Sequence, residues 1–293
     1  MTDFRAKLGS GKFLVTAELN PPKGIDAHQV LQTSEQIGGV IDAYNITDSH
    51  SSIMTMAPIS LAHLLIGKGI DPIVQMTGRD RNRIAIQADM LSAYVLGVRN
   101  ILCMTGDPPS NGDHPEAKSV FDLDGIGLVN AANALMNGHD LAGNPLNESP
   151  SFCIGATVNP GASDLSKEIH RMEQKFEAGA VFFQSQAIFD SETLYKFAER
   201  TQHITVPIIA GVIVLKSSRM AHTLNQRLPD IRIPDAVVRD MERTNDRQKQ
   251  GITVAARIIQ DIKEMVRGVH IMAIKWEKHI PQILEESGLI GNP

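Results

Sequence analysis

Eight short apolar segments alternate with longer segments of helical period along the chain, and this alternation limits the possible folds more than any other feature. Regular alternation of strands and helices requires parallel strands with right-handed crossovers, and eight such units close into a barrel. The sequence therefore predicts a (β/α)8 TIM barrel of the α/β class, formed as a single domain by residues 1–293. The expected strands are Phe13–Leu19, Val40–Ile46, Asp71–Met76, Asn100–Thr105, Phe152–Thr157, Ala180–Ser185, Val206–Val212 and Val269–Ile274.

A doubly wound open sheet is the alternative architecture, and it usually carries a glycine-rich phosphate turn after its first strand. Here that turn reads ELNPPKG, which favours the barrel. Two long irregular segments, Gly106–Asp122 and Gly138–Pro150, are expected to act as lids, because long loops in compact domains are commonly functional. The expected helices are Ala27–Ile37, Ala57–Gly67, Asn82–Leu96, Leu123–Leu135, Leu165–Ala178, Glu192–Thr201, Ser217–Leu228, a helical stretch from Asp235 to Val266, and Pro281–Glu286.

The charge and hydropathy patterns argue against several kinds of partner. A formal net charge of -5 disfavours nucleic acid and anionic membrane surfaces. No apolar run approaches the roughly 20 residues that span a bilayer, and the first residues lack the apolar region of a signal peptide. We therefore expect a soluble, cytoplasmic protein. Cys103 and Cys153 lie in apolar runs and are expected to be buried and reduced, and neither they nor the histidines show metal-ligand spacing.

Polar residues follow the expected strands, where the chemistry of a (β/α)8 barrel is placed. Together they predict a pocket lined by hydrogen-bonding groups and suited to a large, planar, polar ligand. These residues are Glu18, Thr47, Asp48, Gln75, Thr77, Thr105, Gly106, Asp107, Thr157, Asn159, Gln186, Lys216 and Lys275.

Glu18 is the strongest candidate for acid catalysis in this set. Strand alternation places Leu14, Thr16 and Glu18 on one face of the first strand. Burial there is expected to raise the pKa of the Glu18 carboxyl, which suits a general acid. The alternative is a glutamate just beyond the strand end, either solvated or paired with a lysine.

Two further motifs leave a functional and a structural interpretation open. Asp107 follows a strand in MTGDPP, where Gly106 permits close approach of a ligand, although the same residues suit a simple β-turn. Arg171 and Lys175 share a charged helix face with Glu168. That face is either solvated or positioned to meet the phosphate of a nucleotide cofactor.

Four segments in order resemble the methylenetetrahydrofolate reductase family, and the resemblance covers nearly the whole chain from about Phe13. Their order and their spacing on a barrel are more specific than any one of them alone. The segments are VTAELNPP (Val15–Pro22), NILCMTGDPP (Asn100–Pro109), GATVNPGA (Gly155–Ala162) and RMEQKFEAGAVFFQSQAIFD (Arg171–Asp190).

The resemblance implies roles for individual residues. Glu18 matches the family's catalytic acid, Asp107 the aspartate beside the flavin ring, and Gln186 a glutamine that contacts folate. A bound flavin is implied, with FAD favoured over FMN. The residues implied in flavin binding are Thr47, Gln75, Thr105, Gly106, Asp107, Thr157, Asn159, Arg171 and Lys175.

The implied reaction is flavin-dependent reduction of 5,10-methylenetetrahydrofolate to 5-methyltetrahydrofolate, a step of one-carbon metabolism that serves methionine biosynthesis. The electrons come from NAD(P)H or from a partner protein, and the chain is free to form a homo-oligomer. Glu18 protonates the N10 side as the imidazolidine ring opens, and Asp107 stabilises the resulting cation from within a water-poor pocket. Two alternatives remain open: a pterin-binding barrel methyltransferase, and a flavin-binding subunit that is inactive without its partner.

Overall fold

Eight parallel strands form a closed barrel in the computed structural model, which describes residues 4–227 and 231–291. Each strand pairs with the next one along the chain, and β8 pairs with β1 to close the barrel. The predicted (β/α)8 barrel is therefore confirmed. The strands are β1 (Leu14–Leu19), β2 (Ala43–Ile46), β3 (Pro72–Thr77), β4 (Asn100–Met104), β5 (Cys153–Val158), β6 (Phe182–Ala187), β7 (Ile208–Ile213) and β8 (Gly268–Met272).

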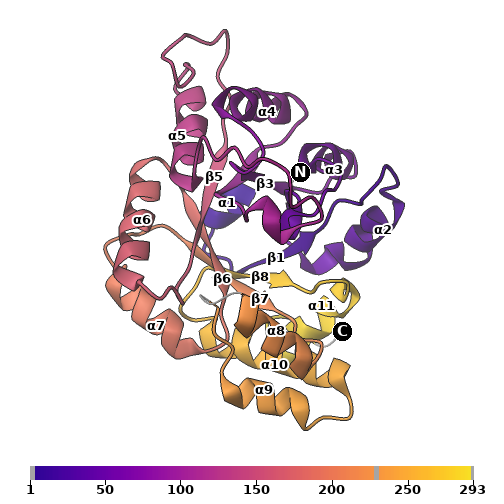
Figure 1. Cartoon of the computed structure of the whole chain (residues 1–293). Coiled ribbons are helices and arrows are strands. Elements are labelled where there is room, and N and C mark those ends of the chain that lie inside the picture. The colour runs from indigo at the N-terminus through magenta and orange to yellow at the C-terminus, as the bar shows by residue number, and fades with distance from the viewer. Residues whose placement is uncertain (1–3, 228–230, 292–293) are drawn as a thin grey trace.

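Helices surround the strands, as Figure 1 shows from α2 round to α9. The predicted Ser217–Leu228 helix corresponds to α8, although its last residue, Leu228, lies outside the described residues. The stretch from Asp235 to Val266 forms two helices, because Asp246 caps the second one by accepting a hydrogen bond from the Lys249 amide at 3.0 Å. The helices are α1 (Phe4–Gly9), α2 (His28–Ile37), η1 (Gly38–Val40), η2 (His50–Ser52), α3 (Pro58–Ile66), α4 (Arg83–Val95), η3 (Pro109–Asn111), α5 (Gly125–Met136), α6 (Leu165–Glu177), α7 (Ser191–Arg200), α8 (Ser218–Arg227), α9 (Asp235–Glu242), α10 (Arg247–Ile262), η4 (Glu277–His279) and α11 (Ile280–Glu286).

The short helix α1 packs against the amino-terminal end of the barrel interior, and the sequence analysis did not predict it. Phe4 and Leu8 join a buried cluster with one inward-facing residue from each of seven strands, among them Leu14. The Phe4 and Phe182 rings meet edge to face with centroids 5.4 Å apart, a geometry that aromatic pairs favour. Apolar packing therefore fills this end of the barrel and leaves the opposite end for polar side chains.

Asp42 connects α1 to the barrel, and hydrogen bonds to it come from three directions. Its carboxylate accepts from the Val15 amide at 3.0 Å and from Lys12 Nζ at 2.9 Å. The ammonium of Lys7, which lies in α1, donates to the Asp42 carbonyl at 2.8 Å and lies 3.1 Å from its carboxylate. Burial tends to raise the pKa of Asp42, but these partners outweigh burial and hold the pKa below its ordinary value.

Both cysteines are buried, as predicted. Burial raises the pKa of the Cys103 thiol to about 12, so that this thiol stays protonated at neutral pH. The loop at 138–150 joins α5 to β5 and therefore lies at the amino-terminal ends of the strands, away from the mouth. Its predicted role as a lid over the site is wrong for that reason. Within residues 4–227 and 231–291, no helix has the length and apolar character needed to cross a membrane.

Replacing Asp42 with Asn should destabilise the fold at neutral pH by about 1–3 kcal/mol, because a charged acceptor of several hydrogen bonds is lost. The folded-state pKa of Asp42 is lowered, so its contribution is complete above the ordinary value of 3.8 and disappears as the pH falls toward the folded-state pKa. Urea unfolding at pH 7 and pH 3 measures both quantities. A difference between wild type and Asp42→Asn that stays equal at the two pH values would contradict this account.

Candidate active site

The carboxyl ends of the strands define one end of the barrel, here called the mouth. The predicted site residues on or directly after β1 to β6 all lie at this end, and Arg171 and Lys175 lie on α6. They separate into a buried group around Glu18, a rim around Asp107, and a third group that joins β5 to α6.

Glu18 lies on β1 at the mouth, and only 7% of its surface is exposed. Glu18 shares a face of β1 with Leu14 and Thr16, as predicted, and the structure shows that this face points into the barrel. His270 on β8 is completely buried, and its Nε2 lies 3.9 Å from Glu18 Oε2. That distance is too long for a hydrogen bond but short enough for a strong electrostatic interaction in a buried site.

A layer of four buried polar side chains lies inside the barrel and sets the orientation of His270. The Asn45 amide nitrogen lies 3.0 Å from His270 Nδ1 and also donates to Gln184 Oε1 at 3.0 Å. Thr16 Oγ1 lies 3.0 Å from the same His270 nitrogen. Because an amide nitrogen only donates, Nδ1 must accept, and the proton of a neutral His270 ring then lies on Nε2, toward Glu18.

This polar layer was not predicted from the sequence. Thr16, Asn45, Gln184 and His270 each interrupt an apolar strand with a polar side chain that points into the barrel. Each of these residues occupies an alternate strand position whose side chain faces the barrel interior, and this alternation could have identified them from the sequence. Among the described residues, Asn45 Oδ1 and His270 Nε2 have no hydrogen-bond partner. Buried polar atoms are normally paired, so these two atoms leave the layer able to form further hydrogen bonds directly beneath the mouth.

The predicted direction of the Glu18 pKa shift is wrong. Burial does raise the pKa, as expected, but His270, the positive charge of His50 and the amide of Asn20 together outweigh burial. The pKa of Glu18 therefore lies below its ordinary value, and the carboxyl is ionised at neutral pH in the ligand-free barrel. Only the effect of burial could be inferred from the sequence, because the histidines come close to Glu18 only in the closed barrel.

Thr47 belongs to the buried group around Glu18. It is buried, and its hydroxyl donates to Asn20 Oδ1 at 2.9 Å. The Asn20 amide in turn reaches Glu18 Oε1 at 3.5 Å. In the ligand-free structure, Thr47 therefore supports Asn20, which in turn contacts the Glu18 carboxyl.

The rim around Asp107 follows β4. Gly106 has a φ of 91°, and an added Cβ would lie 2.9 Å from the Thr77 Cβ, so that only glycine fits this turn. Thr105 accepts a hydrogen bond from the Gly125 amide at 3.2 Å, at the start of α5. Asp107 is exposed, so the water-poor environment expected for its carboxylate is absent from the ligand-free structure.

The third group is already paired within the protein. Lys175 is 5% exposed, and its ammonium donates to the Thr157 carbonyl at 2.7 Å and lies 4.0 Å from Glu168. Burial lowers the pKa of Lys175. Arg171 pairs with Asp124, the cap of α5, at 3.0 Å. The Asn159 amide donates to Glu168 at 2.9 Å.

Gln75 and Gln186 differ in their surroundings. Gln75 is 7% exposed at the end of β3, and the described part of the chain offers its amide no hydrogen-bond partner. Gln186 lies in β6 within the register shift between Gln184 and Ala187, and its side chain is exposed at the rim. Both amides are therefore available to a ligand at the mouth.

The residues at the mouth fit a flavin in part. The partnerless amide of Gln75 suits the polar edge of a flavin ring, and the half-buried Thr157 and Asn159 suit a hydroxylated chain. Arg171 is one-third exposed and is placed to meet a phosphate. Lys175 does not fit that role in this arrangement, because its ammonium faces the backbone of β5.

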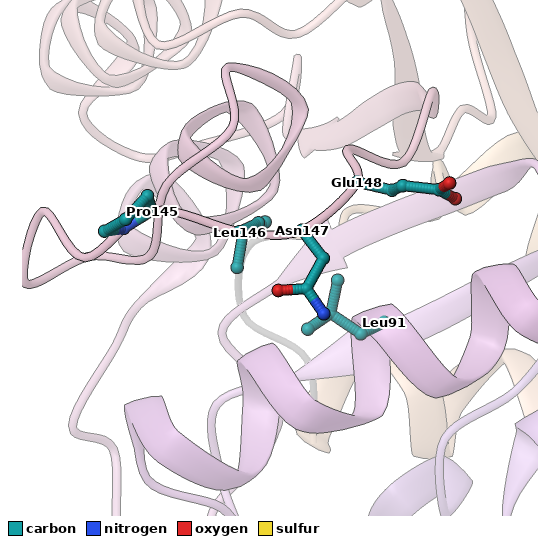
Figure 2. Close-up of a pocket in the computed structure, with 5 residues that line it drawn as sticks. All are labelled: Leu91, Pro145, Leu146, Asn147 and Glu148. Carbon is teal, nitrogen blue, oxygen red and sulfur yellow. The ribbon is translucent and has the colours of Figure 1, made fainter.

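A separate cavity of about 600 Å³ lies outside the barrel, beside α4 and the loop that precedes β5 (Figure 2). Glu148 is the only charged side chain among its lining residues, and the loop lies at the end of the barrel opposite the mouth. Its position and lining give it no connection to the chemistry of Glu18. The lining residues are Leu91, Pro145, Leu146, Asn147 and Glu148.

Fold and site together define a (β/α)8 barrel with a buried carboxylate and histidine at its mouth, together with the available amides of Gln75 and Gln186. The family model described as methylenetetrahydrofolate reductase matches residues 3–288, and the chain belongs to this family. Its relatives include methylenetetrahydrofolate reductase 2 of Schizosaccharomyces pombe, which is 24% identical over 245 residues, 75% of this chain and 36% of the relative. The 5,10-methylenetetrahydrofolate reductase of Salmonella typhimurium is 22% identical over 204 residues, 68% of this chain and 62% of the relative.

The chain therefore spans about a third of the length of the fission yeast relative. Among solved structures, an uncharacterised protein from Clostridium thermocellum has the same fold, with a TM-score of 0.68 and 14% identity over 98% of both chains. That protein is described as binding two copies of 5-methyl-5,6,7,8-tetrahydrofolic acid.

Proposed function

We propose that this chain reduces 5,10-methylenetetrahydrofolate to 5-methyltetrahydrofolate as a flavin-dependent oxidoreductase, with residues 1–293 acting as one domain. The observation that carries the proposal is the buried Glu18 carboxyl, paired with His270 beneath a mouth of free amides. Family membership and the methyltetrahydrofolate named for the Clostridium thermocellum barrel support a folate at this mouth.

In the proposed reaction, Glu18 supplies a proton to N10 as the bond between N10 and the methylene carbon breaks. A folate lying across the mouth removes water from Glu18, and this further burial raises the pKa of Glu18 from its lowered value in the open barrel. Proton donation at neutral pH becomes easier as that pKa approaches the working pH. His270 Nε2 holds the carboxyl in place from below.

Asp107 is assigned to the stabilisation of the cation that remains on the folate once the ring has opened. Its carboxylate is exposed at the rim, and a bound folate would shield it from water. Shielding strengthens the attraction between a fixed charge and a developing opposite charge. We assign Gln186, also exposed at the rim, to folate binding.

A bound flavin, with FAD favoured over FMN, would supply the hydride. Gln75, Thr157, Asn159 and Arg171 are the residues proposed to hold it, together with the Thr105–Asp107 turn. Thr47 contacts the flavin only if its hydroxyl leaves Asn20, and Lys175 only if its ammonium leaves β5. The electrons come from NAD(P)H or from a partner protein.

The first test is the visible absorption spectrum of the protein after reconstitution with FAD and FMN, followed by anaerobic addition of 5-methyltetrahydrofolate. Flavin bands that bleach on addition support the proposal. A colourless protein that transfers methyl groups would replace it with the pterin-binding methyltransferase. Yellow protein that turns over with artificial donors but not with pyridine nucleotides would indicate a subunit that needs its partner.

Glu18→Gln should lower folate turnover by about 10²–10⁴-fold, the usual contribution of general acid catalysis. The amide keeps the size of the side chain but carries no acidic proton, so flavin affinity should stay within about twofold. Stopped-flow bleaching measures turnover, and fluorescence titration measures flavin affinity. Glu35→Gln is the matched control, since Glu35 pairs with Lys68 on the surface. Near wild-type turnover in Glu18→Gln would show that Glu18 is not the general acid.

His270→Gln should move the pH profile of methylenetetrahydrofolate reduction. Reduction needs protonated Glu18, so its rate falls as the pH rises through the pKa of Glu18. Among the interactions that lower this pKa, the one with His270 is the largest, so its removal raises the pKa and shifts the fall in rate to higher pH. His203→Gln, which alters an exposed pair with Glu173, should leave the profile unchanged. A profile that stays in place in His270→Gln would show that His270 does not set the charge of Glu18.

A further inference from the structure

The loop after β2 holds three serines in left-handed backbone conformations. Ser49, Ser51 and Ser52 have φ angles of 50°, 54° and 58°. Such conformations are costly for residues other than glycine and persist only where surrounding contacts impose them. Ser49–Ser52 is here called the serine loop, and it also carries His50, whose charge acts on Glu18.

A buried arginine supplies contacts that hold the serine loop. The Arg79 side chain, which follows β3, is 4% exposed. Its Nη1 approaches the Ser49 carbonyl and the Ser52 hydroxyl at 3.4 Å each, and its Nη2 approaches the Asp48 carbonyl at 3.4 Å. Asp80 balances the charge through hydrogen bonds of 2.6–2.9 Å.

The serine loop also contacts the turn that contains Asp107. The Ser52 hydroxyl donates to the Asp107 carbonyl at 2.9 Å and to the Pro108 carbonyl at 3.1 Å. Since the same oxygen accepts from Arg79, one hydroxyl joins the guanidinium to the backbone of the proposed catalytic aspartate. The rim after β4 therefore takes its position from a residue after β3.

Electrostatics favour this arrangement. Burial tends to lower the pKa of the Arg79 guanidinium, but Asp80, Asp48 and Asp107 outweigh burial and raise it. Asp48 is itself anchored, because it accepts hydrogen bonds from the Thr77 amide and hydroxyl at 2.9 Å each and pairs with Arg81. The guanidinium therefore lies in the field of the Asp107 carboxylate while it holds the loop that supports Asp107.

We propose that Arg79 is a positioning residue that acts through Ser52 to set the place of the Asp107 carboxylate at the mouth. The inference rests on the proposed function, since it assigns Asp107 a task in folate reduction. Arg79 itself is enclosed by the serine loop and does not contact the ligand.

The test is a double-mutant cycle with Arg79→Gln, Ser52→Ala and the combined variant. The measured quantities are the limiting rate of flavin bleaching by 5-methyltetrahydrofolate and the concentration that gives half of this rate. Small displacements of a catalytic group cost up to about 100-fold in rate. Arg79→Gln should therefore lower the limiting rate by about 10- to 100-fold, and the half-saturating concentration should change by less than about threefold.

The double-mutant cycle distinguishes an effect of Arg79 that acts through Ser52 from two independent effects on the rate. If Arg79 acts through Ser52, the combined variant is no slower than Arg79→Gln, whereas independent effects multiply. Arg79→Lys keeps the charge but not the several contacts of the guanidinium and should recover only part of the rate. Arg99→Gln is the control, because Arg99 stacks on Tyr94 just before β4, at the other end of the barrel.

Hydrogen exchange of the same variants tests the contact without any activity. In Arg79→Gln, amides of the serine loop and of η3 should exchange faster, while those of α1 stay unchanged. Unchanged exchange at both loops would overturn the positioning role. Faster exchange in a protein whose wild type shows no reaction with 5-methyltetrahydrofolate would instead overturn the proposed function and leave the contact in place.

Discussion

Closure of the sheet between β8 and β1 is the constraint on which the rest of the molecule depends. Leu14 pairs with Gly268 and Thr16 with His270, and an added Cβ on Gly268 would lie 2.3 Å from the Leu14 carbonyl oxygen. The two strands therefore meet only because residue 268 lacks a side chain. This pairing brings together residues 254 positions apart in the chain and places His270 beneath Glu18.

The barrel interior is apolar at its amino-terminal end and polar nearer the mouth. Apolar side chains, completed by Phe4 and Leu8, fill the amino-terminal layer, whereas Thr16, Asn45, Gln184 and His270 form a polar layer above it. Burying polar groups is unfavourable unless they are hydrogen-bonded. This layer leaves Asn45 Oδ1 and His270 Nε2 without partners in the described ranges, so stability alone does not account for it. The position of the layer beneath Glu18 is instead explained by its support of the Glu18 carboxyl.

Most of the fold could be predicted because strands buried on both faces appear as continuous apolar runs. The inward position of Glu18 followed from the same regularity. The six-residue helix α1 was too short to show a period. The direction of the Glu18 pKa shift depended on His50 and His270, which lie far from Glu18 in the chain. Arg79 lies in a polar GRDRN segment that resembles an ordinary loop, and only the folded chain shows its burial.

The mouth is organised by polar and charged groups held at different depths. His270 lies fully buried below Glu18, Arg79 is enclosed behind the serine loop, and Asp107 is exposed at the rim. A ligand that covers the mouth would affect them unequally, because the buried groups have already lost their water while Asp107 has not. The electrostatic gain from ligand binding therefore concentrates on the rim carboxylate, where a cation forms in the proposed reaction. The strained serine loop therefore bears on the proposed chemistry, since the rim must hold its place before the ligand arrives.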